Sequence, residues 1–334
     1  MRMFQWRKAV LGGLLLATVP LSANAQLVSG LSGGSGSTVG PDGLLYTTES
    51  VSGEVTWIDP ETGDHDLFTW GLPPQIPGVG LGGPMDIAFI GDTAYVLVTL
   101  VDFVGDDPDN PTPVGIYRVN GPGDNEPIAN LGFWSASNEP TIIFDYFVPT
   151  GVQYALEAFQ GALLVTDGHH NRVLHVTTDG VISEFSSFAN EVPTGLSVRG
   201  NRIFMAQAGP VPHLPKDGKV LSLDPLTGEA STVASGGLLL VDVEVSRAPQ
   251  EHGRLYGLSQ GVWDHAAEGS PAYADSGSLI AFNGDGTLDV LAQDLDRPTS
   301  FELIGNSAYV VTLTGDVWAF EGVSTPPHGN GPRK

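Results

Sequence analysis

Two aspartates, Asp86 and Asp242, combine a residue type and a placement that could support chemistry. They hold the same position in two copies of a repeated segment, PMDIAF (84–89) and LVDVEV (240–245). Carboxylate oxygens are ligands that Ca²⁺ prefers, and the ion takes about six to eight oxygens, waters included. Facing each other across a channel, the two carboxylates would form a weak calcium site. The favoured alternative is that each caps backbone N–H groups at the channel rim.

A second aligned set of residues lies one strand later in each copy. Its members, in copy order, are Glu49, Val98, Asp167, Gln207, Ser259 and Thr312. In a sheet of alternating strand direction, the start of the first strand and the end of the second lie on one face. The polar members Glu49, Asp167 and Gln207 are therefore candidate ligands at the channel mouth.

Two further groups of polar and aromatic residues are candidates for chemistry. His169 and His170 are adjacent in a turn, where they could bind a transition metal or act as a base. An exposed turn is the favoured interpretation of that pair. Trp263, Asp264 and His265 lie in a long loop, and aromatic groups beside polar ones suit recognition of a small molecule or a sugar. An aromatic side chain folded onto the scaffold explains them equally well.

The elements that must position these residues are short strands. The stretch 40–63, GPDGLLYTTESVSGEVTWIDPETG, contains two of them. GPDG and DPETG are turn sequences, and they enclose an apolar β-branched run and an alternating run of the strand type. One such unit cannot bury its own apolar face, so the chain has to repeat it. The unit recurs in copies that begin near residues 36, 84, 153, 193, 240 and 298.

Each copy supplies four strand signals at a spacing of about 50 residues, which is typical of propeller blades. The sixth copy lacks its fourth strand, and the segment 26–31, QLVSGL, resembles a fourth strand. We therefore predict an all-β, six-bladed β-propeller of four-stranded blades, closed by this N-terminal strand. Closure would remove the open sheet edge that invites aggregation.

Long insertions between the predicted strands should gather on one face of the propeller. They fall between blades at 70–83 and 132–149, and between the second and third strands of a blade at 101–114, 209–217 and 259–276. Both kinds of connection map to the same face, because strand direction alternates within a blade. Loops held on a rigid scaffold commonly carry function. This face is therefore the predicted location of a binding site, although tolerated surface insertion is the alternative.

The first 25 residues have the pattern of a Sec-type signal peptide. Arg2, Arg7 and Lys8 precede an apolar run, and Ala23-Asn24-Ala25 fits the small-residue rule for cleavage after Ala25. We expect a secreted or periplasmic protein with a leader (1–25), a propeller (26–323) and a disordered Pro/Gly-rich tail (324–334). The apolar run is too short to span a membrane comfortably, so no membrane insertion is expected.

The composition is strongly acidic. The chain has 14 Lys and Arg against 38 Asp and Glu, and three of the basic residues lie in the leader, so the mature net charge is about −27. Such a chain should not bind nucleic acid. There is no cysteine, so stability must come from the core rather than from disulfides. We expect a monomer.

The repeats resemble known propeller families. The segment 163–180, LLVTDGHHNRVLHVTTDG, is similar to the NHL repeat within the broad NHL and SMP-30 class. LVSGL (27–31), GPDGLLYTTE (40–49) and VPTG (192–195) resemble the ScyD/ScyE-type family of secreted propellers. The first blade departs from that family, because it begins GGSG (33–36) where the family has Asn-Pro-Arg-Gly. The Glu-Gly-Pro setting of the metal-binding glutamate in SMP-30 lactonases is also absent, so their ligands are not carried over.

Three functions remain open on the sequence. One of them, an accessory factor acting on a secreted pigment or polyphenol, is suggested only by the name of the ScyD/ScyE family. The favoured one is a non-enzymatic propeller that binds a small molecule or an extracellular partner on the long-loop face, around the channel mouth. The alternative is a Ca²⁺-dependent hydrolase or lactonase of the SMP-30 type, in which the metal would polarise a carbonyl and a carboxylate would activate water. The lactonase requires at least three convergent oxygen ligands at the mouth.

Overall fold

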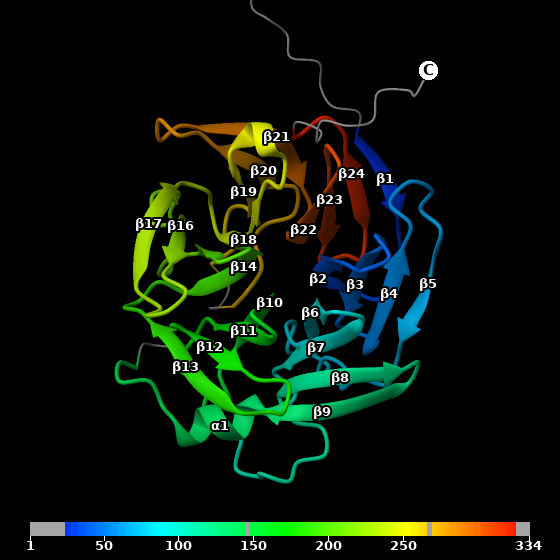
Figure 1. The fold of residues 1–334 in the computed structure, drawn as a ribbon, viewed down its shortest axis with the longest axis vertical. Helices are drawn as coiled ribbons and strands as arrows, with labels where there is room; N and C mark the ends of the chain where they lie inside the picture. The colour runs from blue at the N-terminus through cyan, green and yellow to red at the C-terminus, as the bar shows by residue number, and fades with distance from the viewer. Residues whose placement is uncertain (1–23, 144–146, 266–268, 325–334) are drawn as a thin grey trace, which may run out of the picture.

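The structure is a computed structural model, and it describes residues 24–143, 147–265 and 269–324. Within these ranges, twenty-four strands form six antiparallel sheets of four strands each. The sheets are arranged as blades around a central axis, as Figure 1 shows. The prediction of an all-β, six-bladed propeller is therefore confirmed.

The first three blades follow one another along the chain. Blade 1 consists of β2 (Gly34–Val39), β3 (Leu45–Glu49), β4 (Glu54–Ile58) and β5 (His65–Thr69). Blade 2 consists of β6 (Gly83–Ile90), β7 (Thr93–Thr99), β8 (Gly115–Gly121) and β9 (Asp124–Asn130). Blade 3 consists of β10 (Gln153–Phe159), β11 (Ala162–Asp167), β12 (Arg172–Val176) and β13 (Ile182–Ser187).

The remaining blades complete the ring. Blade 4 consists of β14 (Pro193–Arg199), β15 (Arg202–Gln207), β16 (Lys219–Leu223) and β17 (Ala230–Ser235). Blade 5 consists of β18 (Leu240–Val245), β19 (Leu255–Ser259), β20 (Gly277–Phe282) and β21 (Leu288–Leu295). Blade 6 consists of β22 (Pro298–Ile304), β23 (Ser307–Thr312), β24 (Val317–Phe320) and the N-terminal strand β1 (Asn24–Val28).

Strand β1 closes the ring as predicted. It pairs antiparallel with β24, and Gln26 lies opposite Trp318. The strand begins two residues before the expected cleavage site, and its segment from Gln26 to Val28 carries the pairing with Trp318 and Val317. The rest of the expected leader, and the tail after residue 324, lie outside the described residues.

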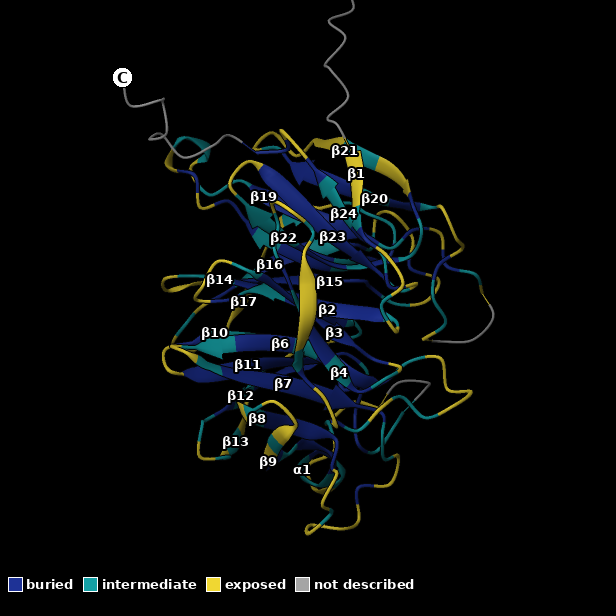
Figure 2. Ribbon diagram, turned by 90° about the vertical axis from the view of Figure 1, so that its right-hand side faces the viewer, coloured by how far each residue is buried: buried dark blue, intermediate teal, exposed yellow. Residues whose placement is uncertain are grey.

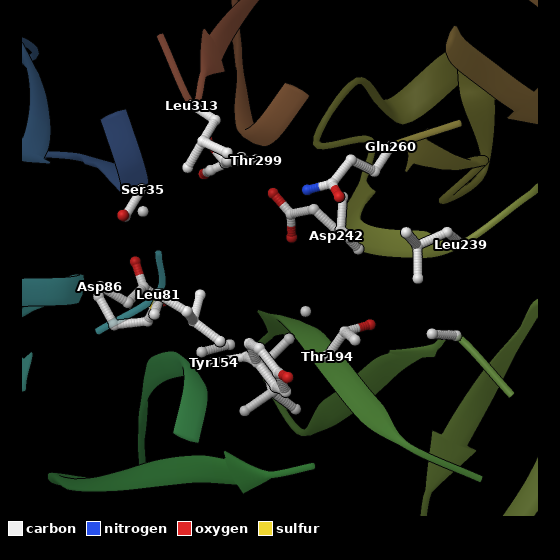
Figure 3. Close-up of a pocket in the computed structure, with 18 of the residues that line it drawn as sticks. Ser35, Leu81, Asp86, Tyr154, Thr194, Leu239, Asp242, Gln260, Thr299 and Leu313 are labelled. Carbon is white, nitrogen blue, oxygen red and sulfur yellow. The ribbon is translucent and has the colours of Figure 1, made fainter. Parts of the chain in front are cut away.

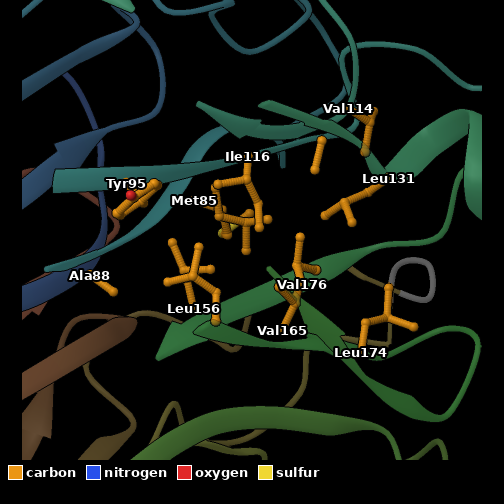
Figure 4. Close-up of a cluster of buried hydrophobic side chains, with 13 residues drawn as sticks. Met85, Ala88, Tyr95, Val114, Ile116, Leu131, Leu156, Val165, Leu174 and Val176 are labelled. Carbon is orange, nitrogen blue, oxygen red and sulfur yellow. The ribbon is translucent and has the colours of Figure 1, made fainter. Parts of the chain in front are cut away.

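The hydrophobic core lies between neighbouring blades rather than along the axis. Strand faces alternate, so each blade presents one apolar face to each neighbour. Figure 4 shows one such layer, in which Met85 and Ile116 of blade 2 pack against Leu156, Val165 and Leu174 of blade 3. Figure 2 shows the inner strands, such as β3, β7 and β15, in the buried colour, and the loops in the exposed colour. This stacking fixes the first strand of every blade at the axis.

One helix was not expected from the sequence. Helix α1 (Leu131–Ser137) lies in the insertion between blades 2 and 3. Asn130 precedes it, and the side-chain oxygen of this residue accepts a hydrogen bond from the Phe133 N–H. Leu131 and Ser135 are buried, so tertiary contacts stabilise a segment too short to show a helical period. None of the helices in the described ranges has the length and apolarity needed to cross a membrane.

Candidate functional site

A pocket opens into the central channel from the face that carries the long loops. Its volume is about 140 Å³, close to that of an apolar cavity of about 150 Å³ that holds benzene. The first strands of the blades form its inner wall, and the loops 70–83, 209–217 and 259–276 contribute residues to its rim. Figure 3 shows these side chains, with Asp86 and Asp242 on different sides of the channel.

The pocket wall is mainly apolar, with a few polar groups. Leu81, Leu239 and Leu313 come from the connections at the mouth, and Leu196 and Val241 come from first strands. A second set of lining side chains can form hydrogen bonds: Tyr154, His169, Thr194, His213 and Gln260. An apolar wall with a small number of polar groups is the usual composition of a small-molecule site.

Asp86 joins two blades through its carboxylate. Its Oδ1 accepts a hydrogen bond from the N–H of Ile87, and its Oδ2 accepts one of 2.7 Å from the N–H of Leu156 in blade 3. Burial raises the pKa of Asp86 well above its usual range, and the two backbone hydrogen bonds lower it by less. The charge of Asp242 raises it further.

Asp242 repeats this arrangement in blade 5. Its Oδ1 accepts a hydrogen bond from the N–H of Val243, and its Oδ2 accepts one of 2.9 Å from the N–H of Phe301 in blade 6. Burial raises its pKa to about 7, against the hydrogen bonds from Phe301, Val243 and the side chain of Ser300. In both cases the preceding blade has a glycine at the aligned position, Gly36 or Gly195.

The two glycines are required by the close approach of these carboxylates. A Cβ on Gly36 would lie 2.2 Å from Oδ1 of Asp86 and 2.6 Å from its Cα. A Cβ on Gly195 would lie 2.4 Å from Oδ1 of Asp242 and 2.6 Å from its Cα. Each aspartate therefore bridges to the next blade and packs directly on the previous one.

The two aspartates do not by themselves supply the three convergent ligands expected of a calcium site. Both oxygens of Asp86 and both of Asp242 already accept backbone hydrogen bonds. No group of three or more His, Cys, Asp or Glu side chains within the described residues is placed to hold a metal. Asp86 and Asp242 instead accept hydrogen bonds from backbone N–H groups, which is the capping role predicted as the alternative to a metal site.

A deeper layer of the channel holds three glutamates that the sequence analysis did not single out. Glu157, Glu244 and Glu302 line the pocket. Each lies two residues after the aligned aspartate position of its own blade, so the alternation of a strand turns it to the same side. This period was visible in the sequence and could have identified them.

Burial raises the pKa of Glu157 to about 8, and it raises those of Glu244 and Glu302 well above their usual range. Mutual repulsion among the three contributes to the shifts of Glu244 and Glu302. Arg247 lowers all three values, but burial outweighs its effect. Burial therefore favours the protonated form of these three carboxyl groups, and Arg247 opposes it.

The second aligned ring does not reach the pocket, which corrects the expectation for Glu49 and Gln207. Glu49 is buried, and its carboxylate accepts hydrogen bonds from the Ser32 N–H and the Thr56 hydroxyl. Gln207 is buried and donates to the Asp217 carbonyl at 3.0 Å. Both residues lie at the end of the second strand of a blade, where they bind neighbouring connections instead of facing the axis.

Asp167 belongs to the same ring and lies in a buried ionic cluster outside the pocket lining. Its Oδ2 is 3.1 Å from Nε of Arg172 and 3.1 Å from Nδ1 of His170. All three residues are at most 2% exposed. Burial by itself would raise the pKa of Asp167, but His170 and Arg172 together lower it. His170 is therefore neither an exposed turn residue nor a pocket ligand.

Arg172 links this cluster to helix α1. It donates hydrogen bonds to the Asn138 carbonyl at 2.7 Å and the Ser135 hydroxyl at 3.1 Å. Its guanidinium lies 4.9 Å from the centre of the Trp134 ring. The cluster therefore fixes the long connection between blades 2 and 3 to the scaffold. Nothing local in the sequence marks Arg172, whose partners lie 34 and 37 residues away.

His169 does line the pocket. Its Nε2 lies 3.3 Å from the hydroxyl of Tyr154, which comes from the first strand of blade 3. Tyr154 was not singled out in the sequence, because nothing local marks it. The pair places a ring nitrogen and a phenol beside the mouth.

The loop between β19 and β20 contributes to the rim through Gln260, Ser270 and Pro271 rather than through its Trp-Asp-His segment. Trp263 is 7% exposed and packs with Ala208, Leu239 and Ala272. Asp264 accepts a hydrogen bond from Ser270, and the His265 ring lies 4.7 Å from that of Trp263. Trp263 is thus the aromatic side chain folded onto the scaffold, and it supports the rim from beneath.

Comparison with known proteins identifies the fold class. No family model and no curated protein matches the chain. Among solved structures, a gluconolactonase from Xanthomonas campestris is similar at a TM-score of 0.59 and 12% identity, over 90% of this chain and 89% of that one. A calcium-binding regucalcin from Agrobacterium tumefaciens is similar at a TM-score of 0.56 and 12% identity, over 92% of this chain and 98% of that one.

A virginiamycin B lyase from Staphylococcus aureus is similar at a TM-score of 0.53 and 12% identity, over 90% of this chain and 98% of that one. At this level of identity the likeness concerns the arrangement of the chain and not its chemistry. The protein has the fold of the six-bladed propellers to which the gluconolactonases and regucalcin belong.

Proposed function

We propose that this protein binds a small molecule in the channel mouth on the long-loop face. The observation that carries the proposal is the pocket of about 140 Å³, which combines an apolar wall with several polar side chains. A site at the mouth of a closed β-structure is a common location for ligands. Strands from every blade and loops from one face converge there, so the geometry of the site is fixed by the whole ring.

Benzyl alcohol is a suitable probe, because its size matches the pocket volume. We expect saturable binding in ligand-observed NMR, and we expect Leu313→Trp to abolish it by filling the pocket. The matched control is Leu226→Trp, because Leu226 is 87% exposed on a hairpin between third and fourth strands and should not affect binding. Unchanged binding in the Leu313 variant would contradict this location.

A lactonase or another hydrolase is the second candidate, and the likeness to gluconolactonases favours it. The absence of a three-residue metal group within the described ranges weighs against a metal-dependent version. A screen of lactones and esters with and without EDTA separates the candidates. Turnover that EDTA and Asp86→Ala both abolish would favour the hydrolase over the binding protein.

We further propose that the protein is secreted or periplasmic and belongs to the ScyD/ScyE-type propellers. The leader pattern (1–25) supports export, and the motifs in 27–31, 40–49 and 192–195 support the family. Expression with the native leader, followed by N-terminal sequencing of the exported protein, tests the first point. A mature chain that begins at Gln26 is the expected result.

A further inference from the structure

The pocket has two chemically different parts. The mouth is lined by leucines such as Leu81, Leu239 and Leu313, and the inner part is lined by carboxyl groups. Asp86 and Asp242 form the upper acidic layer, and Glu157, Glu244 and Glu302 form the lower one. A ligand that fills this space must present an apolar body to the mouth and a different group to the acidic layers.

The two acidic layers contain five carboxyl groups, and Arg247 is the positive residue that acts on the three glutamates among them. It is an exposed residue in the connection after β18. The pKa values of the glutamates nevertheless stay raised, because burial and repulsion outweigh it. A second positive charge in the channel would be attracted by these groups when they ionise.

The five carboxyl groups differ in how fully their hydrogen-bonding capacity is used. Asp86 and Asp242 are occupied by backbone N–H groups. Glu244 accepts a hydrogen bond from the Ser197 hydroxyl at 3.1 Å, and an interaction with the Val198 backbone lowers the pKa of Glu157. Glu302 accepts no hydrogen bond from any residue in the described part of the chain. It is the carboxyl group best placed to accept one from a ligand.

We propose, building on the proposed binding function, that the ligand is a primary amine with an apolar body, whose ammonium group enters the channel and is bound by Glu302. An ammonium group suits the site better than a metal ion does. It brings three N–H donors and does not require three convergent ligands. The phenol ring of Tyr154 on the pocket wall offers a second favourable surface to a cation. Anions should bind more weakly, because the five carboxyl groups of the two acidic layers can acquire only negative charge.

Three probes of similar size and different charge test this proposal: benzylammonium, benzyl alcohol and benzoate. Calorimetry at pH 7.5 should show benzylammonium binding at least about tenfold more tightly than benzyl alcohol, which corresponds to about 1.4 kcal/mol. Benzoate should bind most weakly. Glu302→Gln should reduce benzylammonium binding about tenfold and leave benzyl alcohol binding unchanged.

The control separates binding by Glu302 from attraction by the acidic surface as a whole. Glu61→Gln makes the same change of charge at an exposed residue of the hairpin between β4 and β5, and it should leave all three affinities unchanged. If Glu302→Gln does not fold, Glu157→Gln provides a second change in the same layer. Circular dichroism verifies folding of each variant.

The outcomes distinguish this proposal from the function on which it rests. Benzyl alcohol binding as tightly as benzylammonium would overturn the amine proposal and leave the binding pocket intact. Benzylammonium selectivity that survives both glutamate substitutions would also overturn it. Failure of all three probes to bind would overturn the proposed binding function itself.

Discussion

Asp242 and Asp167 are both buried acids, yet their surroundings shift their pKa values in opposite directions. Asp242 faces the channel, accepts hydrogen bonds from backbone N–H groups, and has a pKa raised to about 7. Asp167 lies between strands and loops beside Arg172 and His170, and its pKa is lowered. Burial raises both, but only the second has a buried cation as a partner.

This comparison shows that burial does not by itself define a functional carboxylate. The pair of Asp167 and Arg172 is a structural ion pair that holds the connection containing helix α1. The channel carboxyls lack such a partner and line the pocket. Perturbed pKa values beside an open cavity are the better indication of a binding site.

The largest expected effect comes from removing the cation of the buried ion pair. Arg172→Met should lower the free energy of unfolding by about 3 to 5 kcal/mol, because it leaves the Asp167 carboxylate buried and uncompensated. Urea denaturation measures it. Arg118→Met is the control, since the Arg118–Glu126 pair is exposed and should contribute at most about 1 kcal/mol. Equal losses in the two variants would contradict the interpretation of Asp167 and Arg172 as a buried structural ion pair.

The channel carboxyls should make the protein less stable as the pH rises. A raised pKa means that the folded state keeps protons that the unfolded state has lost, so stability falls with pH until the folded groups ionise. With pKa values of about 7 for Asp242 and about 8 for Glu157, this loss continues between pH 6.5 and 8.

We expect the free energy of unfolding to fall by on the order of 2 kcal/mol over this interval, since one retained proton contributes about 1.4 kcal/mol per pH unit. Urea unfolding at each pH measures it. Asp242→Asn should flatten the lower part of the curve. Stability that rises over this range would contradict the raised pKa values of the channel carboxyl groups.

The close packing of the channel aspartates predicts a loss of comparable size. Gly36→Ala and Gly195→Ala should each cost about 1 to 3 kcal/mol, because the added Cβ would overlap Asp86 or Asp242. Thermal denaturation compares the two variants with Gly121→Ala, where an added Cβ has no heavy atom within 4 Å. A loss in only one of the two glycine variants would show that the two aspartates are not packed alike.

The smallest effect concerns the difference between the two channel aspartates. The side chain of Ser300 lowers the pKa of Asp242, whereas the residue aligned with Ser300 in blade 3 is Ala155. Ser300→Ala should therefore raise the pKa of Asp242 by about half a unit, or about 0.7 kcal/mol. A carboxyl ¹³C NMR titration measures the shift, with Ser278→Ala on the outer part of blade 5 as the control. An unchanged pKa would mean that the hydroxyl has no part in it.

The sequence was sufficient to predict the fold and the face of the pocket. Turn sequences such as GPDG and DPETG divide the chain into strands, and the missing fourth strand of the last copy predicted closure by β1. These signals are local, since turn chemistry and the two-residue period of a strand depend on neighbours in the sequence. The same period placed Asp86 and Asp242 at aligned positions of two first strands.

The tertiary structure decided what each aligned acid does. Asp167 and Asp242 are equally acidic in the sequence, but only the folded chain brings Arg172 and His170 against one of them. Tyr154, Gln260 and Leu313 enter the pocket from three blades, and no local pattern connects them. A side chain's partners come from distant segments, and their charge and burial set its pKa and its role. The repeat therefore determined where the carboxyl groups lie along their strands, and packing between blades determined which of them remain open to a ligand.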